Sequence, residues 1–347
     1  MGFSPRCLPT AVGSLPHREP REACELVFRH LSAIPAWPQL PRRSFRENMY
    51  VQYGERFPGL VVDMEREKVY VDRARADDEL ERLYLAYLED QVEDWGISAE
   101  NAAGLHTFLS YREALAGAHA VKGQVTGPIS MGLQVTDTSL RPILYDEVLA
   151  DALAKHLRLK AAWMERQLRR LHGTTIVFVD EPYLAAYGSA FVSLSREQVI
   201  AALEEVFSGL SGIKGVHCCG NTDWSILLET SVQILNLDAY NYAQSLSLYP
   251  EAVRAFLRRG GIVAWGIVPQ DEEGIFAATV ESLLERLEAA WGLLTAKGIP
   301  LDDLLAACLI TPSCGLGSVS PGAAARALEL TAGLSQAVRE KYRVDSP

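Results

Sequence analysis

Short runs of β-branched and other apolar residues alternate with amphipathic stretches of about 15 residues along most of this chain. This alternation is typical of βαβ units, in which each helix returns the chain so that successive strands run parallel. The apolar runs predict strands at Leu8–Val12, Ala120–Val125, Thr175–Val179, Gly212–His217, Val232–Leu237, Gly261–Trp265 and Ala306–Thr311. The amphipathic stretches predict helices at Glu19–Leu31, Asp77–Gln91, Asp146–Leu171, Arg196–Ser208, Tyr249–Arg258, Ala277–Lys297 and Pro321–Tyr342. We therefore expect an α/β fold, a (β/α)8 barrel of the TIM type.

One stretch, Pro35–Asp72, interrupts this rhythm. Its second half reads GLVVDMEREKVYVD, which predicts a hairpin of two alternating strands around a charged turn. We interpret the stretch as an insertion after the first strand, near the mouth of the barrel. A chain of 347 residues is long enough for two domains, but α/β barrels of this length are common as one. Because no repeat or low-complexity linker divides the sequence, we expect one barrel domain over residues 1–347.

The charged residues disfavour several classes of partner. The chain has 33 basic and 44 acidic side chains and a net charge of −11. This balance disfavours nucleic acid, whose binding needs a basic surface that replaces counterions. It also suits a negatively charged membrane surface poorly, and no apolar run reaches the roughly 18 residues of a spanning helix. The first residues lack the long apolar core of a secretory signal, so we expect a cytoplasmic protein without a nucleic-acid or membrane partner.

The sequence VHCCGNTDW carries the strongest chemical signal, because His217 and Cys219 stand two residues apart where a predicted strand ends. Side chains at i and i+2 of an extended segment point the same way, whereas Cys218 faces the other side. Cys314, in LITPSCGLGS, directly follows the last predicted strand, and Asp238 ends the run VQILNLD. Nitrogen, sulfur and carboxylate ligands of this kind suit Zn²⁺, which prefers tetrahedral sites.

Each of these residues could instead have a purely structural role. Buried cysteines are mostly small apolar fillers, and a His-x-Cys pair alone is a weak indication of a metal. The six cysteines, however, belong to a chain too large to need disulfides, and in a reducing compartment clustered cysteines more often bind metals. The candidates also fall at the carboxyl ends of different predicted strands, where parallel barrels build their active sites. The joint placement favours a metal site.

Further candidates follow other predicted strands. Gly13 and Ser14 lie in TAVGSLPH, Thr126 in KGQVTGPIS, and the acidic pair Asp180 and Glu181 in VFVDEPYL. A glycine lets a ligand approach the backbone closely, and an acidic pair could bind an amine or transfer a proton. Turns and helix caps are the alternative, since Ser and Asp are favoured N-cap residues.

The segments TAVGSLP, KGQVTGP, VDEP, HCCGN and PSCGLGS resemble, in order and spacing, the catalytic domain of cobalamin-independent methionine synthase. They are also similar to its zinc relatives, the methylcobamide:coenzyme M methyltransferases and the epoxyalkane:coenzyme M transferases. The wider superfamily includes uroporphyrinogen decarboxylase. The resemblance covers nearly the whole chain and is weakest across residues 35–72.

The resemblance implies a zinc site and a substrate site. His217, Cys219 and Cys314 match the family's zinc ligands, and Asp238 stands where methionine synthases carry a glutamate ligand. The resemblance also implies substrate contacts for Gly13 and Ser14 and places Asp180 and Glu181 in the family's Asp-Glu-Pro motif. We expect further substrate contacts from Thr126, which follows the second predicted strand, and from Arg43. Gly13 and Ser14 match the segment that grips the amino-acid end of homocysteine.

Three departures bear on the methyl donor. The methionine synthases have a further N-terminal barrel that helps to hold folate, for which we see no room here. Val268, in WGIVPQ, replaces a histidine thought to protonate the departing folate. Arg43 or a neighbour in PRRSFRENMYVQYGE stands where a glutamate binds the substrate ammonium. A methylated corrinoid needs no such proton, because cobalt(I) leaves readily, so we expect methylcobalamin or a corrinoid protein as donor.

Together these features predict a zinc-dependent thiol methyltransferase. A free thiol has a pKa near 8.5, and coordination to Zn²⁺ converts it to a nucleophilic zinc thiolate at neutral pH. The acceptor is a small-molecule thiol: homocysteine, as in methionine biosynthesis, or one like coenzyme M. The alternatives are a metal-free decarboxylase of the uroporphyrinogen type, a methyl-folate-dependent methionine synthase, and a zinc-stabilised scaffold or corrinoid-binding module.

Overall fold

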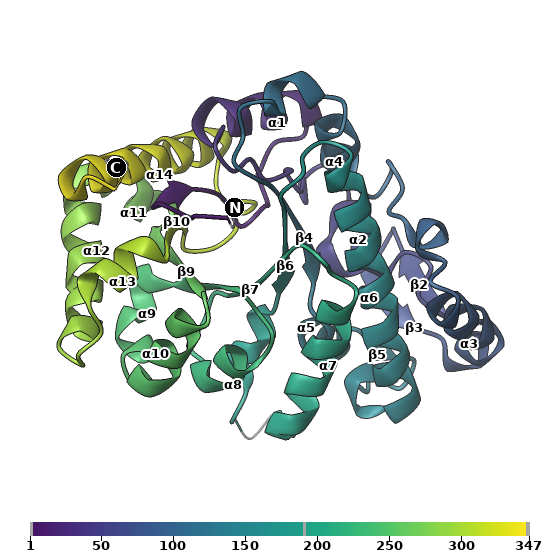
Figure 1. Ribbon diagram of the computed structural model, residues 1–347. Helices are drawn as coiled ribbons and strands as arrows, with labels where there is room; N and C mark the ends of the chain where they lie inside the picture. Colours follow the sequence, from purple (N-terminus) through teal and green to yellow (C-terminus); the bar gives the residue numbers. More distant parts are fainter. Residues whose placement is uncertain (1–2, 190–191, 345–347) are drawn as a thin grey trace.

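The computed structural model describes residues 3–189 and 192–344. Its main sheet has seven parallel strands in the order β1-β10-β9-β8-β7-β6-β4. The strands are β1 (Leu8–Pro9), β4 (Val121–Thr126), β6 (Thr175–Asp180), β7 (Ile213–Cys218), β8 (Ile234–Asp238), β9 (Ile262–Val268) and β10 (Cys308–Pro312). Each of the seven predicted runs overlaps one of them, and all but the first of these strands extend past the predicted end by one to three residues. The sheet curls, and helices surround it (Figure 1). An α/β fold with a parallel sheet is therefore confirmed.

The gap between the edge strands β1 and β4 holds an irregular segment, residues 35–39. Its backbone makes one isolated parallel bridge to each edge, Ala36 to Lys122 and Gln39 to Ser14. The supporting hydrogen bonds include Trp37 N to Lys122 O at 3.2 Å. Pro35 at the start of the segment and Pro38 within it lack the N–H that a regular ladder needs. Regular strands thus form only seven of the eight expected positions among the described residues, and a closed (β/α)8 barrel is not shown.

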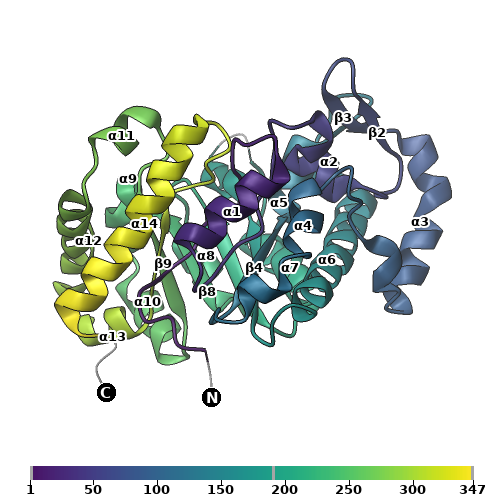
Figure 2. The same ribbon diagram turned by 90° about the horizontal axis from the view of Figure 1, so that it is seen from above.

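The expected hairpin is present. Strands β2 (Leu60–Asp63) and β3 (Lys68–Val71) pair antiparallel, and the Asp63 carboxylate accepts bonds from two backbone amides of the turn. A third strand that the sequence does not predict, β5 (Thr136–Asp137), adds parallel to β3. The hairpin lies beside the helix that follows it, on one side of the molecule and outside the curled sheet (Figures 1 and 2).

All seven predicted helices are present among the described residues. The α-helices are α1 (Pro20–His30), α2 (Met49–Gly54), α3 (Arg73–Leu88), α4 (Ala103–Phe108), α5 (Pro128–Gln134), α6 (Glu147–Arg169), α7 (Arg196–Ser208), α8 (Trp224–Glu229), α9 (Ala239–Leu246), α10 (Pro250–Arg258), α11 (Glu272–Ala277), α12 (Val280–Thr295), α13 (Leu301–Ala306) and α14 (Pro321–Tyr342). Short 3₁₀ helices are η1 (Phe45–Glu47), η2 (Val92–Trp95), η3 (Arg112–Leu115), η4 (Ile143–Tyr145) and η5 (Pro182–Ala186). Side-chain caps set several starts, such as the Ser195–Gln198 capping box of α7. None of the described helices is long and apolar enough to cross a bilayer.

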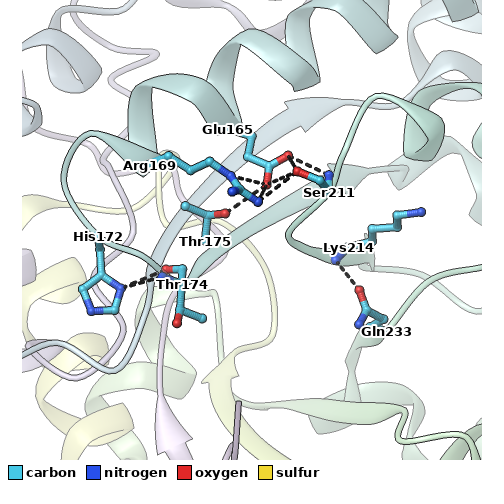
Figure 3. Close-up of polar contacts among 8 residues, drawn as sticks. All are labelled: Glu165, Arg169, His172, Thr174, Thr175, Ser211, Lys214 and Gln233. Atoms are coloured by element: carbon cyan, nitrogen blue, oxygen red, sulfur yellow. Dashed lines mark hydrogen bonds and ion pairs between the residues drawn. The ribbon is translucent and has the colours of Figure 1, made fainter. Parts of the chain in front are cut away.

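A polar cluster fixes the amino ends of two central strands (Figure 3). Glu165 of α6 accepts hydrogen bonds from Thr175 Oγ1 at 3.2 Å and from Ser211 N at 2.8 Å, and pairs with Arg169 at 2.8 Å. Thr175 begins β6, and Ser211 precedes β7. The cluster thus anchors α6 at the end of the sheet that serves stability in parallel barrels, which leaves the carboxyl ends free for chemistry.

Candidate metal centre

Three metal-ligating side chains meet at the carboxyl ends of the strands. His217 lies in β7, Cys219 is the first residue after that strand, and Cys314 lies in the loop after β10. The ligand atoms of these three side chains are all within 4.8 Å of one another. Because β8 and β9 separate β7 from β10, a flat sheet would hold the two strands about 14 Å apart. The curl of the sheet therefore creates the group. Cys218 points to the opposite side and is fully buried in the core, as the alternation predicts.

The two thiols of this group are electrostatically unequal. A hydrogen bond from Cys314, together with His217, lowers the pKa of Cys219 to about 4. The same bond and burial raise the pKa of Cys314 well above its ordinary value. The pair therefore releases its first proton readily and shares the second. One imidazole, one thiol that ionises readily and a second thiol beside it form a donor set that suits Zn²⁺.

One ring nitrogen of His217 is available to bind a metal ion. Its Nδ1 lies 2.7 Å from Asn236 Oδ1, whereas its Nε2 is buried and has no hydrogen-bond partner among the described residues. An unsatisfied buried ring nitrogen is costly unless another group, such as a metal ion, completes it. No sequence motif marks Asn236, although it stands two residues before Asp238 on the same strand and so faces the same side.

Asp238 ends β8 but is not a member of the group. Its carboxylate caps α9, accepting bonds from Asn241 N at 2.9 Å and from Asn241 Nδ2 at 2.7 Å. Burial raises its pKa, and the bonds from Asn241 oppose that shift. Both oxygens are thus engaged, and a role as a metal ligand stays a prediction.

The two acidic residues of the predicted pair, Asp180 and Glu181, have different surroundings. Asp180, the last residue of β6, lines a cavity beside His217 and Cys219, and its Oδ1 has no hydrogen-bond partner among the described residues. Burial raises its pKa to about 6, against the lowering influence of His217 and Lys122. Glu181 turns away: its carboxylate accepts bonds at 2.6–2.9 Å from Ile129 N, Ser130 N and Ser130 Oγ, at the start of α5. Only Asp180 is therefore placed to meet a ligand.

The cavity has a volume of about 460 Å³ and includes the three clustered residues in its lining. Its polar walls also include Ser14, Gln39, Arg42, Glu47, Asp180 and Gln270. This cavity lies at the carboxyl ends of parallel strands, the position at which such folds bind their ligands.

Of the other residues predicted to contact the substrate, one lines this cavity and the rest do not. Ser14 lines it and accepts a bond from Gly317 N at 3.3 Å, which ties the first loop to the loop that carries Cys314. Gly13 is outside the lining, and a Cβ there would approach Gln124 Nε2 to 2.5 Å. Thr126 is buried beside Asp180 in the sheet register, outside the lining.

Glu47 reaches the cavity from the stretch in which the sequence analysis singled out Arg43. Its side chain is buried, and burial raises its pKa to about 7, while Arg43 opposes the shift. Arg43 itself lies outside the lining and contacts Glu47 at 3.2 Å. The preceding residue, Arg42, lines the cavity. Nothing in the local sequence distinguishes these charges, because η1 and the turn before it decide which of them points inward.

No family model and no curated protein matches the sequence. Solved structures do. A B12-independent methionine synthase from Shewanella sp. W3-18-1, in complex with selenomethionine, is 16% identical with a TM-score of 0.58, over 97% of this chain and 99% of that one. A methyltransferase from Methanosarcina mazei is 13% identical with a TM-score of 0.57, over 94% of this chain and 87% of that one. At these identities the comparisons show a shared fold, which extends over almost the whole chain.

Proposed function

We propose that this protein is a zinc-dependent enzyme that transfers a methyl group to a small-molecule thiol. The observation that carries the proposal is the grouping of His217, Cys219 and Cys314 within 4.8 Å of one another in a cavity. Three protein ligands with one position left for a substrate is the arrangement of catalytic zinc sites. The two structures of shared fold, a methionine synthase and a methyltransferase, support the same chemistry.

The chain's own residues would bind, orient and isolate the reactants. A bound zinc ion supplies a Lewis acid that lowers the pKa of the acceptor thiol and makes it nucleophilic at neutral pH. His217, Cys219 and Cys314 would hold that ion, and Asp180 lines the same cavity with a carboxylate oxygen that has no hydrogen-bond partner among the described residues. The buried walls of the cavity exclude water and align the sulfur with the methyl carbon.

We propose an amino-acid thiol such as homocysteine as the acceptor. The cavity lining carries the buried carboxyls of Glu47 and Asp180 and the guanidinium of Arg42. A ligand ammonium would restore the ionisation that burial opposes in the two carboxyls, and a ligand carboxylate suits the arginine. An anionic thiol like coenzyme M would use only the arginine. The selenomethionine bound to the Shewanella protein supports an amino-acid ligand.

For the donor we propose a methylated corrinoid, free or on a partner protein. The supporting observation is Val268, the last residue of β9, which is fully buried and offers no proton to a departing folate. Methyl-folate is the second candidate. It is favoured by the Shewanella protein, which is described as B12-independent and is covered over 99% of its length.

An assay of zinc-loaded enzyme with two thiols and two donors tests this function. Initial rates are measured with homocysteine or coenzyme M, and with methylcobalamin or methyl-tetrahydrofolate. We expect transfer from methylcobalamin to homocysteine, and none by Cys314→Ala. The Cys218→Ala variant, altered at a thiol on the opposite face of the strand, serves as the control and keeps its activity. Turnover with methyl-folate alone would overturn the donor assignment, and no methyl transfer to either thiol would overturn the function.

A further inference from the structure

Asn236 occupies the centre of a hydrogen-bond network directly behind His217. It lies in β8, is fully buried, and reaches residues of three other strands. Its Oδ1 is 2.7 Å from His217 Nδ1 on β7, and its Nδ2 donates to Ala264 O on β9 and to Thr311 Oγ1 on β10, each at 2.8 Å. Both amide protons and the amide oxygen are therefore engaged.

This network leaves only one orientation for the amide of Asn236. A backbone carbonyl such as Ala264 O can only accept a hydrogen bond, so the NH₂ group must face it. The amide oxygen must then face His217. An oxygen at 2.7 Å requires a proton on His217 Nδ1, which leaves the lone pair of the neutral ring on Nε2.

The nitrogen selected in this way is the one that is left for a metal ion. His217 Nε2 is buried and without a hydrogen-bond partner among the described residues, and His217 belongs with Cys219 and Cys314 to the group within 4.8 Å. The network also restrains the ring, because a 180° flip would put the carbon Cδ2 where Nδ1 lies and so remove the hydrogen bond to the amide. One buried side chain thus sets the tautomer and the orientation of the ring.

We infer that Asn236 is a positioning residue that presents His217 Nε2 to the metal ion. The inference rests on the proposed metal centre. It goes beyond that proposal by naming the residue that makes His217 able to bind the metal ion through Nε2. A neutral amide orients the ring without adding charge to a site that already contains two thiols and would bind the thiol of the substrate as well. Thr311 and Ala264 act through Asn236 and hold its amide plane.

Zinc affinity, measured by competition with a chromophoric chelator, tests the inference without any activity assay. Loss of an outer partner of a metal-bound histidine typically weakens metal binding about 10- to 100-fold. We expect a loss of this size for Asn236→Leu, which has a similar volume. Thr311→Val, which removes one of the two bonds that hold the amide, should lose less than Asn236→Leu. Cys218→Ala, on the same strand as His217 but directed into the core, is the matched control and should bind zinc like wild type.

A second measurement keeps the inference testable if Asn236→Leu does not fold. The ¹⁵N chemical shifts of His217 in zinc-loaded wild type should show a protonated Nδ1 and a metal-bound Nε2. A metal-bound Nδ1 would overturn the assignment, as would unchanged zinc affinity in a folded Asn236→Leu protein. Wild type that binds no zinc would instead refute the proposed metal centre, and the inference with it. The two failures are therefore distinguishable.

Discussion

At the scale of single residues, alternation along a strand is the sequence signal that leads to the candidate site. It predicts that His217 and Cys219 face one point and Cys218 the core, and the structure has this arrangement. Glu47 and Asn236 were not identified, because their importance comes from what packs against them and not from local spacing. Contacts between distant strands supply that information, and a single sequence does not contain it.

Asp238 provides a test of ligand exchange at this scale. Its carboxylate caps α9 but stands at the end of the strand next to β7. We expect Asp238→Ala to reduce methyl transfer while most of the zinc stays bound, because a displaceable carboxylate contributes less to affinity than a thiolate. Asp238→Asn preserves a good N-cap and separates the loss of charge from the loss of the cap, which typically costs about 1 kcal/mol. Zinc content and rate are measured together. Complete loss of zinc from both variants would make Asp238 an essential anchor.

Glu47 gives the protein a stability that depends on pH. Burial raises its folded-state pKa to about 7 from an ordinary value of 4.5. Between these pH values the folded protein retains a proton that the unfolded chain has released, so this carboxyl's contribution to stability falls as pH rises. The melting temperature of Glu47→Gln relative to wild type should therefore increase between about pH 5 and about pH 7.5. Thermal unfolding across this range measures it, and a constant difference would refute a buried neutral carboxyl.

At the scale of secondary structure, the sequence predicts the elements with the most regular patterns. The seven strands are short apolar runs because both faces of a parallel sheet are buried. The segment at residues 35–39 was interpreted as part of an insertion, but it lies between β1 and β4. Its prolines remove the strand signal together with the ladder hydrogen bonds. The two-residue strand β5 is too short to leave any pattern.

A substitution at Gly59 tests whether the turn before the hairpin requires a glycine. It precedes β2 with φ at +69°, and an added Cβ would collide with the Asp72 carbonyl and lie 2.8 Å from Ala76 Cβ. Gly59→Ala should therefore lower the free energy of unfolding by about 1–3 kcal/mol. Gly117→Ala is the matched control, because a Cβ there meets nothing within 4 Å. Denaturant unfolding of both variants measures the difference, and equal stabilities would show that the turn before β2 adapts freely.

At the scale of the whole molecule, the fold explains why distant segments form one site. His217 and Cys314 are far apart in the sequence; His217 lies on β7, Cys314 follows β10, and two strands separate β7 from β10. Curling of the sheet closes that distance, and Ser14 then joins the first loop to the loop of Cys314. The two solved structures share this fold over almost the entire chain at 16% and 13% identity. The α/β fold with its parallel sheet was predictable from periodicity, whereas the ligand set needed the arrangement in space.

The metal content of four proteins tests the central claim most directly. Wild type, Cys218→Ala, Cys219→Ala and Cys314→Ala are purified, stripped of metal, reloaded with zinc and analysed for zinc per chain. The claim predicts one zinc ion per chain in wild type and in Cys218→Ala, whose thiol faces the core. It predicts loss of that zinc from Cys219→Ala and Cys314→Ala, because each contributes a ligand atom to the group with His217. Stoichiometric zinc retained by Cys314→Ala, or none bound by wild type, would contradict it.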